Sequence, residues 1–297
     1  MDFKEHIKTN KPNISEGTLK TYNSLLKTIY KNSFGDHKNP DLRNFKKTEE
    51  VLKFLNEKPY NARKTYFSAL VCIEPGEPVY KKLMMGDIEK YNENIEENKS
   101  SPKLDASTIT TDEIEKIAGE LKNDFDLLLK KKSHSIKDLM EMQNYIIMCL
   151  YHGFIVPRRS LDYVNMKFTG YDKDTDNYID MKKNIMIFNR FKTDKVKGQQ
   201  TLDIPLALKK ILLKWIGIVG DKTDYLLFNK KYEPLTSITL NQRLNSIFGS
   251  KKSVNSLRHY YLTNKYKKLM EANEIMGEDM EKMGSSNKQA KVYVKVN

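Results

Sequence analysis

Residues 177–204 read NYIDMKKNIMIFNRFKTDKVKGQQTLDI, and this stretch decides the fold class. Its apolar residues do not recur at helical spacing. They form three short runs, 177–181, 184–188 and 200–204, joined by turns rich in Asp and Lys. Short apolar runs between turn residues are typical of β-strands. We therefore expect a mainly α protein with a small antiparallel β-sheet in its C-terminal part.

Helical periodicity surrounds this stretch on both sides. Thr110-Thr-Asp-Glu113 has the pattern of a capping box, in which Thr and Glu side chains satisfy the first backbone N–H groups of a helix. Gly284 is a C-terminal stop for the last helix. Further helices are expected over 135–151, 205–218, 236–248, 253–270 and 273–283.

The first hundred residues have the pattern of a bundle of short helices. A polar, unpatterned stretch, Glu96-Glu-Asn-Lys-Ser-Ser-Pro-Lys103, follows them and has the composition of a linker. The predicted domains are therefore a helical domain over 1–98, a linker over 99–108 and a second domain over 109–297.

The charge balance points to a polyanionic partner. The chain has 297 residues, and its 52 Lys and Arg exceed its 39 Asp and Glu by 13. Between Lys251 and Lys268 six cations occur without an acid. Nucleic acid is the commonest partner of such a surface. The alternative is the Lys- and Asn-rich composition of proteins encoded by an AT-rich genome.

Several protein classes are excluded by composition. No apolar stretch approaches the roughly 20 residues of a membrane span, and the N-terminus has no secretory pattern, so an intracellular protein is expected. The two cysteines, Cys72 and Cys149, cannot form a disulfide framework. The five histidines are scattered, and the Asp172–Asp176 stretch lacks the glycine of a calcium loop. We expect no metal site, and without a phosphate-binding glycine loop we expect no cofactor.

Four segments carry the residues that remain for chemistry. They are Pro157-Arg-Arg-Ser-Leu-Asp-Tyr163, Arg190-Phe-Lys-Thr193, Val254-Asn-Ser-Leu-Arg-His259 and Met283-Gly-Ser-Ser286, the last followed by Tyr293. In this order they resemble the tyrosine recombinase (phage-integrase-like) family. Its catalytic domain runs Arg, a hairpin Lys, His-x-x-Arg, Gly-His and a nucleophilic Tyr near the C-terminus.

The resemblance assigns a catalytic role to six residues. The first family Arg is followed three positions later by an acid, which favours Arg159 because Asp162 follows it. The roles then fall in chain order on Arg159, Lys192, Asn255, Arg258, Ser285 and Tyr293. Asn255 and Ser285 stand where the family has its two histidines.

Chemistry explains why such residues are needed. Attack of the Tyr293 phenol on a phosphodiester builds negative charge on two oxygens, and the planar guanidinium groups of Arg159 and Arg258 match that geometry. Lys192 would protonate the departing 5′-oxygen. The resemblance implies a 3′-phosphotyrosyl intermediate formed without metal or ATP.

The resemblance also implies a fold and partners. A tyrosine recombinase catalytic fold would follow a helical core-binding (SAM-like) domain that clamps double-stranded DNA. The chain would be a site-specific recombinase or integrase of viral or mobile-element type, monomer or dimer when free and a homo-tetramer on paired sites. It would act in a host nucleus or cytoplasm, or in a virion, and not at a membrane. The expected DNA contacts are Arg158, Arg190, Lys195, Lys197, Lys251, Lys252 and His259.

Two other functions stay open. A type IB DNA topoisomerase shares the chemistry and would act as a monomer on supercoiled DNA. A DNA-binding protein that kept the fold and lost catalysis is the other, and Asn255 and Ser285 are the residues that favour it.

Overall fold

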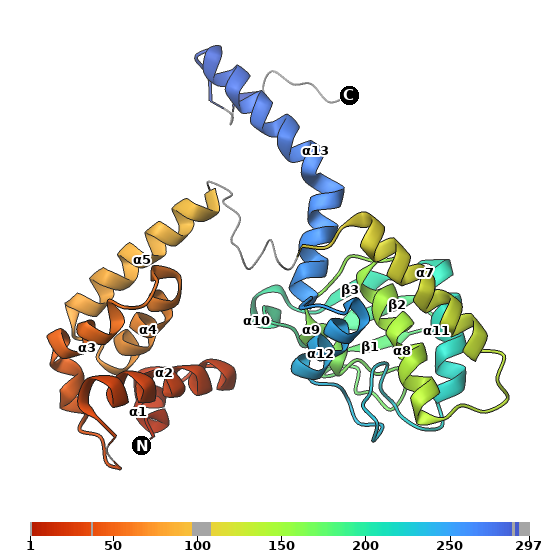
Figure 1. The fold of residues 1–297 in the computed structure, drawn as a ribbon, viewed down its shortest axis with the longest axis horizontal. Coiled ribbons are helices and arrows are strands. Elements are labelled where there is room, and N and C mark those ends of the chain that lie inside the picture. Colours follow the sequence, from red (N-terminus) through yellow and green to blue (C-terminus); the bar gives the residue numbers. More distant parts are fainter. Residues whose placement is uncertain (1, 37, 97–107, 287–288, 291–297) are drawn as a thin grey trace. The chain divides into compact units, whose positions relative to one another are not determined.

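A computed structural model describes residues 2–36, 38–96, 108–286 and 289–290 (Figure 1). The chain divides into two compact units, 1–100 and 101–297, and each has a hydrophobic core of its own. Most of the expected linker lies outside the described residues. None of the described helices is long and apolar enough to span a membrane.

Unit 1 is entirely helical in its described residues. Its core is rich in aromatic rings: Phe3 and Tyr30 each meet Phe45 at centroid distances of 5.5 and 5.6 Å, with rings edge to face. The Tyr80 hydroxyl donates to the carbonyl of Phe45, which satisfies a buried polar group. The helices are α1 (Lys4–Asn10), α2 (Glu16–Phe34), the 3₁₀ helix η1 (Leu42–Lys46), α3 (Thr48–Leu55), α4 (Tyr60–Ile73) and α5 (Pro78–Glu96).

Unit 2 is mainly helical with one small antiparallel sheet, as predicted. The strand order is β1-β2-β3, with Ile179 opposite Met186 and Met186 opposite Leu202. The strands are β1 (Tyr178–Asp180), β2 (Ile185–Phe188) and β3 (Gln200–Asp203). The helices are α7 (Thr111–Leu128), α8 (Ile136–Tyr151), α9 (Ser160–Val164), α10 (Asp194–Lys197), α11 (Leu206–Val219), α12 (Ser237–Phe248) and α13 (Val254–Lys282).

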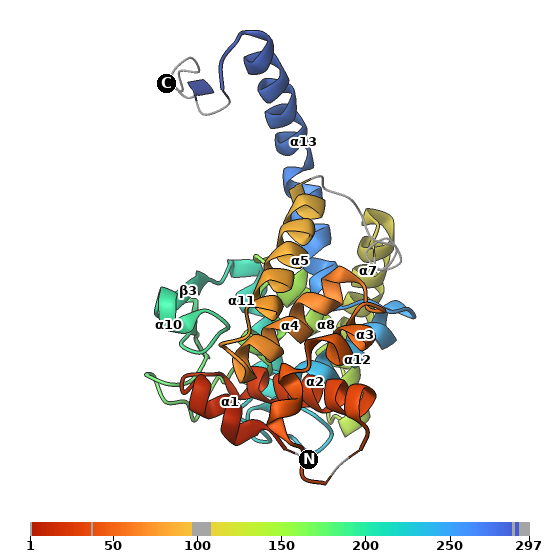
Figure 2. The same cartoon turned by 90° about the vertical axis from the view of Figure 1, so that its left-hand side faces the viewer.

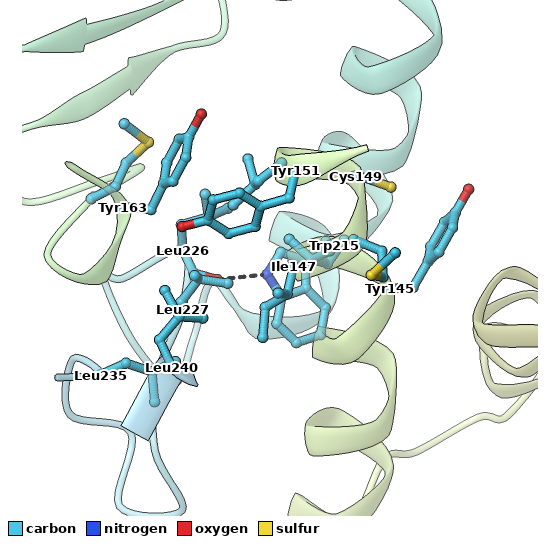
Figure 3. Packing of buried hydrophobic residues seen from close by; sticks show 14 of the residues in the cluster. Tyr145, Ile147, Cys149, Tyr151, Tyr163, Trp215, Leu226, Leu227, Leu235 and Leu240 are labelled. Atoms are coloured by element: carbon cyan, nitrogen blue, oxygen red, sulfur yellow. Dashed lines mark hydrogen bonds between the residues drawn. The ribbon is translucent and has the colours of Figure 1, made fainter. Parts of the chain in front are cut away.

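Helix α8 passes through the core of unit 2, and every residue from Tyr145 to Tyr151 is buried. Two buried polar side chains of this core, Gln143 and Trp215, have hydrogen-bond partners, whereas the hydroxyls of Tyr151 and Tyr163 have none among the described residues. Gln143 on α8 donates to the carbonyl of Phe228 and accepts its N–H, at 3.0 and 2.8 Å. Trp215 Nε1 donates to the carbonyl of Leu226 at 3.0 Å (Figure 3). The Gln143 pair joins the middle of α8 to Phe228, and the candidate site begins just beyond the C-terminal end of this helix.

The two helices expected over 253–270 and 273–283 are one continuous helix, α13, of 29 residues. The residues between them, Met270-Glu-Ala-Asn273, include good helix formers and no proline, so nothing interrupts the backbone bonds. The stop at Gly284 is confirmed. Gly284 has a φ of 70°, its N–H donates to Glu281, and the N–H of Ser285 donates to Met280. Figures 1 and 2 show the far half of α13 projecting beyond the rest of unit 2.

Candidate functional site

Arg158 lies in the turn between α8 and α9 and is held on three sides. Its Nε donates to Asp162 Oδ2 at 2.8 Å, and a terminal nitrogen donates to Gln200 Oε1 at 3.0 Å. Its guanidinium carbon stands 3.9 Å from the centroid of the Phe188 ring. We expected Arg158 to contact DNA. In this structure its guanidinium is engaged inside the protein.

Arg159 is the free arginine of the same turn. It is the N-cap residue of α9, its side chain is exposed, and it has no hydrogen bond or ion pair among the described residues. The acid at position 162 pairs with Arg158, four residues before it, and this pairing leaves Arg159 open to solvent. The neighbouring arginines therefore differ: one is structural, and the other is available to an anion.

Asp162 is the carboxylate around which the arginines gather. It is 3% exposed, and its Oδ1 has no hydrogen-bond partner in the described part of the chain. Burial raises the pKa of Asp162, and the positive charges of Arg158, Arg159 and Arg258 oppose that rise. Three guanidinium groups thus act on one carboxylate. The excess of two positive charges makes this a site for an anion.

Arg258 reaches this site from the start of α13. Ser253 caps the helix in a capping box with Ser256, and Val254 and Leu257 bury one side of the first turn. Arg258 is half-buried and has no hydrogen bond or ion pair with any described residue. The packing of the first helical turn fixes the backbone of Arg258, and its guanidinium group has no partner among the described residues. The guanidinium is therefore preorganised to bind an oxygen atom of a ligand.

The other two predicted residues at the start of α13, Asn255 and His259, are exposed. Asn255 lies three residues before Arg258 and therefore near its face of the helix, whereas His259 lies one residue after it and points elsewhere. Of these two side chains, that of Asn255 is the one that can reach an anion bound to Arg258.

Lys192 lies in the loop that joins β2 to β3. Its side chain is exposed, and no described residue forms a hydrogen bond or ion pair with it. The preceding residue, Phe191, is buried, and its ring centroid lies 5.3 Å from the guanidinium carbon of Arg158. Lys192 therefore follows directly a residue packed on the arginine turn. Three other cations of this loop are also exposed: Arg190, Lys195 and Lys197.

Asn177 joins the loop to the arginine turn, and the sequence analysis missed it. Its Oδ1 accepts the N–H groups of Asn189 and Arg190, at 2.9 and 2.8 Å. Its Nδ2 donates to the carbonyls of Arg190 and Asp162, at 2.8 and 3.0 Å. The residue is 4% exposed, so these four bonds replace all of its contacts with water. The feature of the sequence that could have pointed to Asn177 is its place at the first position of a predicted strand.

Lys252 is buried, although we expected it to contact DNA. It is 7% exposed; its Nζ donates to the carbonyl of Thr108 and lies 4.0 Å from Glu113 Oε2. Its ammonium is therefore not available to a phosphate and instead joins the start of α13 to the start of α7. Lys251, next to it, is exposed, and its expected contact with DNA stays a prediction.

Ser285 does not lie with the arginines. Ser285 follows the end of α13, and the helix separates Arg258 from Lys282 by about 36 Å at 1.5 Å per residue. Tyr293 lies outside the described residues. The structure therefore brings together Arg159, Arg258 and Asp162, and it does not bring Ser285 to them. Among the residues described, no group of three or more His, Cys, Asp or Glu could hold a metal ion.

No family model matches the chain, and no curated protein matches its sequence. Among solved structures the chain is similar to the crystal structure of XerA recombinase. The sequence identity is 13%, the TM-score is 0.38, and the match covers 88% of this chain and 83% of that chain. A match at this level carries no functional argument, so the residues of the site have to support the function on their own.

Proposed function

We propose that the chain is a DNA strand-breaking and rejoining enzyme, a site-specific recombinase or integrase. The observation that carries the proposal is the surplus of two guanidinium charges around Asp162: Arg158 pairs with this carboxylate, and Arg159 and Arg258 have no partner among the described residues. Two unpaired guanidinium groups fit the two non-bridging oxygens of a phosphodiester.

The reaction follows from the predicted roles. The Tyr293 phenolic oxygen bonds to phosphorus as it loses its proton, and the bond from phosphorus to the 5′-oxygen breaks. Arg159 and Arg258 stabilise the charge that builds on the phosphoryl oxygens. Lys192 donates a proton to the departing 5′-oxygen. The products are a 3′-phosphotyrosyl enzyme and a free 5′-hydroxyl, and attack by a 5′-hydroxyl reverses the step.

Covalent trapping tests the proposal. A nicked duplex with the sequence of the DNA that flanks the gene should give a covalent protein–DNA adduct, and Tyr293→Phe should abolish it. Tyr60→Phe is the matched control, since it removes a phenol from α4 in unit 1, which supplies no residue of the proposed site. An adduct that survives Tyr293→Phe would overturn the assignment of the nucleophile.

A second substrate isolates the proposed role of Lys192. Replacing the bridging 5′-oxygen by sulfur creates a leaving group that departs as a thiolate and needs little help from an acid. Lys192→Ala should therefore lose cleavage of the ordinary duplex and keep cleavage of the sulfur-containing one. Arg258→Ala should lose both, by about 100- to 1000-fold, because both reactions build the same phosphoryl charge.

A DNA-binding protein without catalysis is the second candidate. Asn255 and Ser285 in the histidine positions favour it, as does the length of α13 between Arg258 and Ser285. Its signature would be DNA binding that weakens steeply with salt and no adduct from either substrate. Relaxation of supercoiled plasmid by a monomer would instead favour a topoisomerase.

A further inference from the structure

The far half of α13 exposes a row of large apolar side chains. One further methionine of this half, Met280, is only 5% exposed, because other residues of the same chain cover it. Exposed apolar rows of this kind mark surfaces that bind another protein. The exposed members are Leu262 (51%), Tyr266 (38%), Leu269 (64%), Met270 (58%), Ile275 (59%) and Met283 (64%).

Most of these residues follow a coiled-coil repeat. Spacings of four and three residues alternate without a break, as in the a and d positions of a heptad. Asn273 is the one polar member, in the middle of the row. We call this row the α13 seam. It consists of Leu262, Tyr266, Leu269, Asn273 and Met276; Met280 and Met283 continue the spacing, but Met280 is buried within its own chain.

Charge divides the same helix into two halves. Residues 262–270 contain three lysines and no acid, whereas residues 271–282 contain five acids and one lysine. Two such helices side by side in the same direction would place like charges together. In opposite directions the basic half of each meets the acidic half of the other.

We propose that the α13 seam binds the α13 seam of a second copy, with the two helices antiparallel. The interface is isologous, so it closes as a dimer. It does not depend on the proposed DNA chemistry, and it exists without DNA.

The spacing specifies the register. A two-fold axis level with residue 271 pairs Tyr266 with the partner's Met276 and Leu269 with the partner's Asn273. Lys265 then lies near the partner's Asp279 on the side of the seam where Ala272 lies. The pair occurs twice by symmetry. Lys265 and Asp279 flank the seam, and the exposed, small Ala272 side chain allows the two helices to approach closely at the axis.

Cysteine cross-linking distinguishes the two directions. The native thiols, Cys72 and Cys149, are 2% and 1% exposed, so an introduced cysteine on α13 is the accessible one. Oxidation of the full chain carrying Ala272→Cys should give a disulfide-linked dimer. Glu271→Cys, on the opposite side of the helix from the seam, is the matched control and should stay monomeric under denaturing electrophoresis. Cross-linking by Tyr266→Cys without Ala272→Cys would indicate parallel helices and overturn the proposal.

A charge exchange tests the flanking pairs by sedimentation equilibrium without DNA. Lys265→Glu and Asp279→Lys should each weaken dimerisation by about tenfold, since each changes two exposed pairs. The double variant should restore it. Leu269→Lys should abolish dimerisation and leave the helical circular dichroism signal unchanged. A wild-type chain that stays monomeric at roughly 100 µM, or a double variant no better than the single ones, would overturn the proposal.

Discussion

The α8–α9 turn carries the proposed catalytic residue Arg159, and the far half of α13 carries the proposed dimer seam. The turn is packed against the core, whereas the far half of the helix is mostly exposed. In the turn Arg158 has three partners and Asp162 is 3% exposed. Beyond Leu262 the helix exposes most of its apolar side chains. Regions with few buried contacts open at the lowest free-energy cost. The difference separates a preorganised cationic site from a segment that gains its contacts through assembly.

Removing a partner from the held region should have the largest effect. Arg158→Ala leaves the buried Asp162 carboxylate without its ion pair, and we expect it to lower the free energy of unfolding by about 3–5 kcal/mol. Arg159→Ala, one residue away and exposed, should change it by less than about 0.5 kcal/mol. Urea unfolding followed by circular dichroism measures both.

The control for this pair replaces both charges. Arg158→Met combined with Asp162→Asn removes the ion pair and leaves no buried charge alone, so it should recover much of the loss. Equal destabilisation by Arg158→Ala and Arg159→Ala would contradict the structural difference between the two arginines.

Two leucines of α13 sharpen the comparison on a single helix. Leu257 is fully buried and Leu269 is 64% exposed. Leu257→Ala should cost about 2–5 kcal/mol of unfolding free energy, because it removes buried contacts and leaves a cavity. Leu269→Ala should cost less than about 0.5 kcal/mol in the monomer. Thermal unfolding at low protein concentration separates the two, and a large loss from Leu269→Ala would mean that the seam is covered within the chain.

The local elements could be predicted from the sequence. The runs 177–181, 184–188 and 200–204 contain the observed strands with ends within one residue, because each is bounded by turn residues. The choice of Arg159 as the first catalytic arginine rests on the acid three residues after it and stays a prediction; in the structure that acid, Asp162, pairs with Arg158 instead. The i,i+4 pairing of Arg158 with Asp162 leaves Arg159 open, which agrees with that choice.

Long-range contacts could not be predicted. Lys252 is buried against Thr108, 144 residues earlier in the chain, and nothing near it in sequence distinguishes it from the exposed Lys251. The bond from Asn177 to Asp162 likewise joins two segments whose proximity depends on the packing of the sheet against α9. Continuity of α13 was missed because Asn273 has a weak helix propensity, which the residues around it override.

Thiol reactivity compares the burial of the two regions directly, and the variant that it requires has the smallest expected effect on stability. Burial raises the pKa of the Cys149 thiol to about 12, and burial also raises the pKa of Cys72. An exposed thiol introduced by Ala272→Cys should have a pKa near the reference value of about 8.5. At pH 8 the thiolate fraction of Cys149 is then lower by more than about 1000-fold. In the reduced protein, at a concentration low enough to keep it monomeric, iodoacetamide should label position 272 alone, identified by peptide mass, and in urea all three thiols should react. Labelling of native Cys149 at the rate of position 272 would show that α8 opens as readily as the far half of α13.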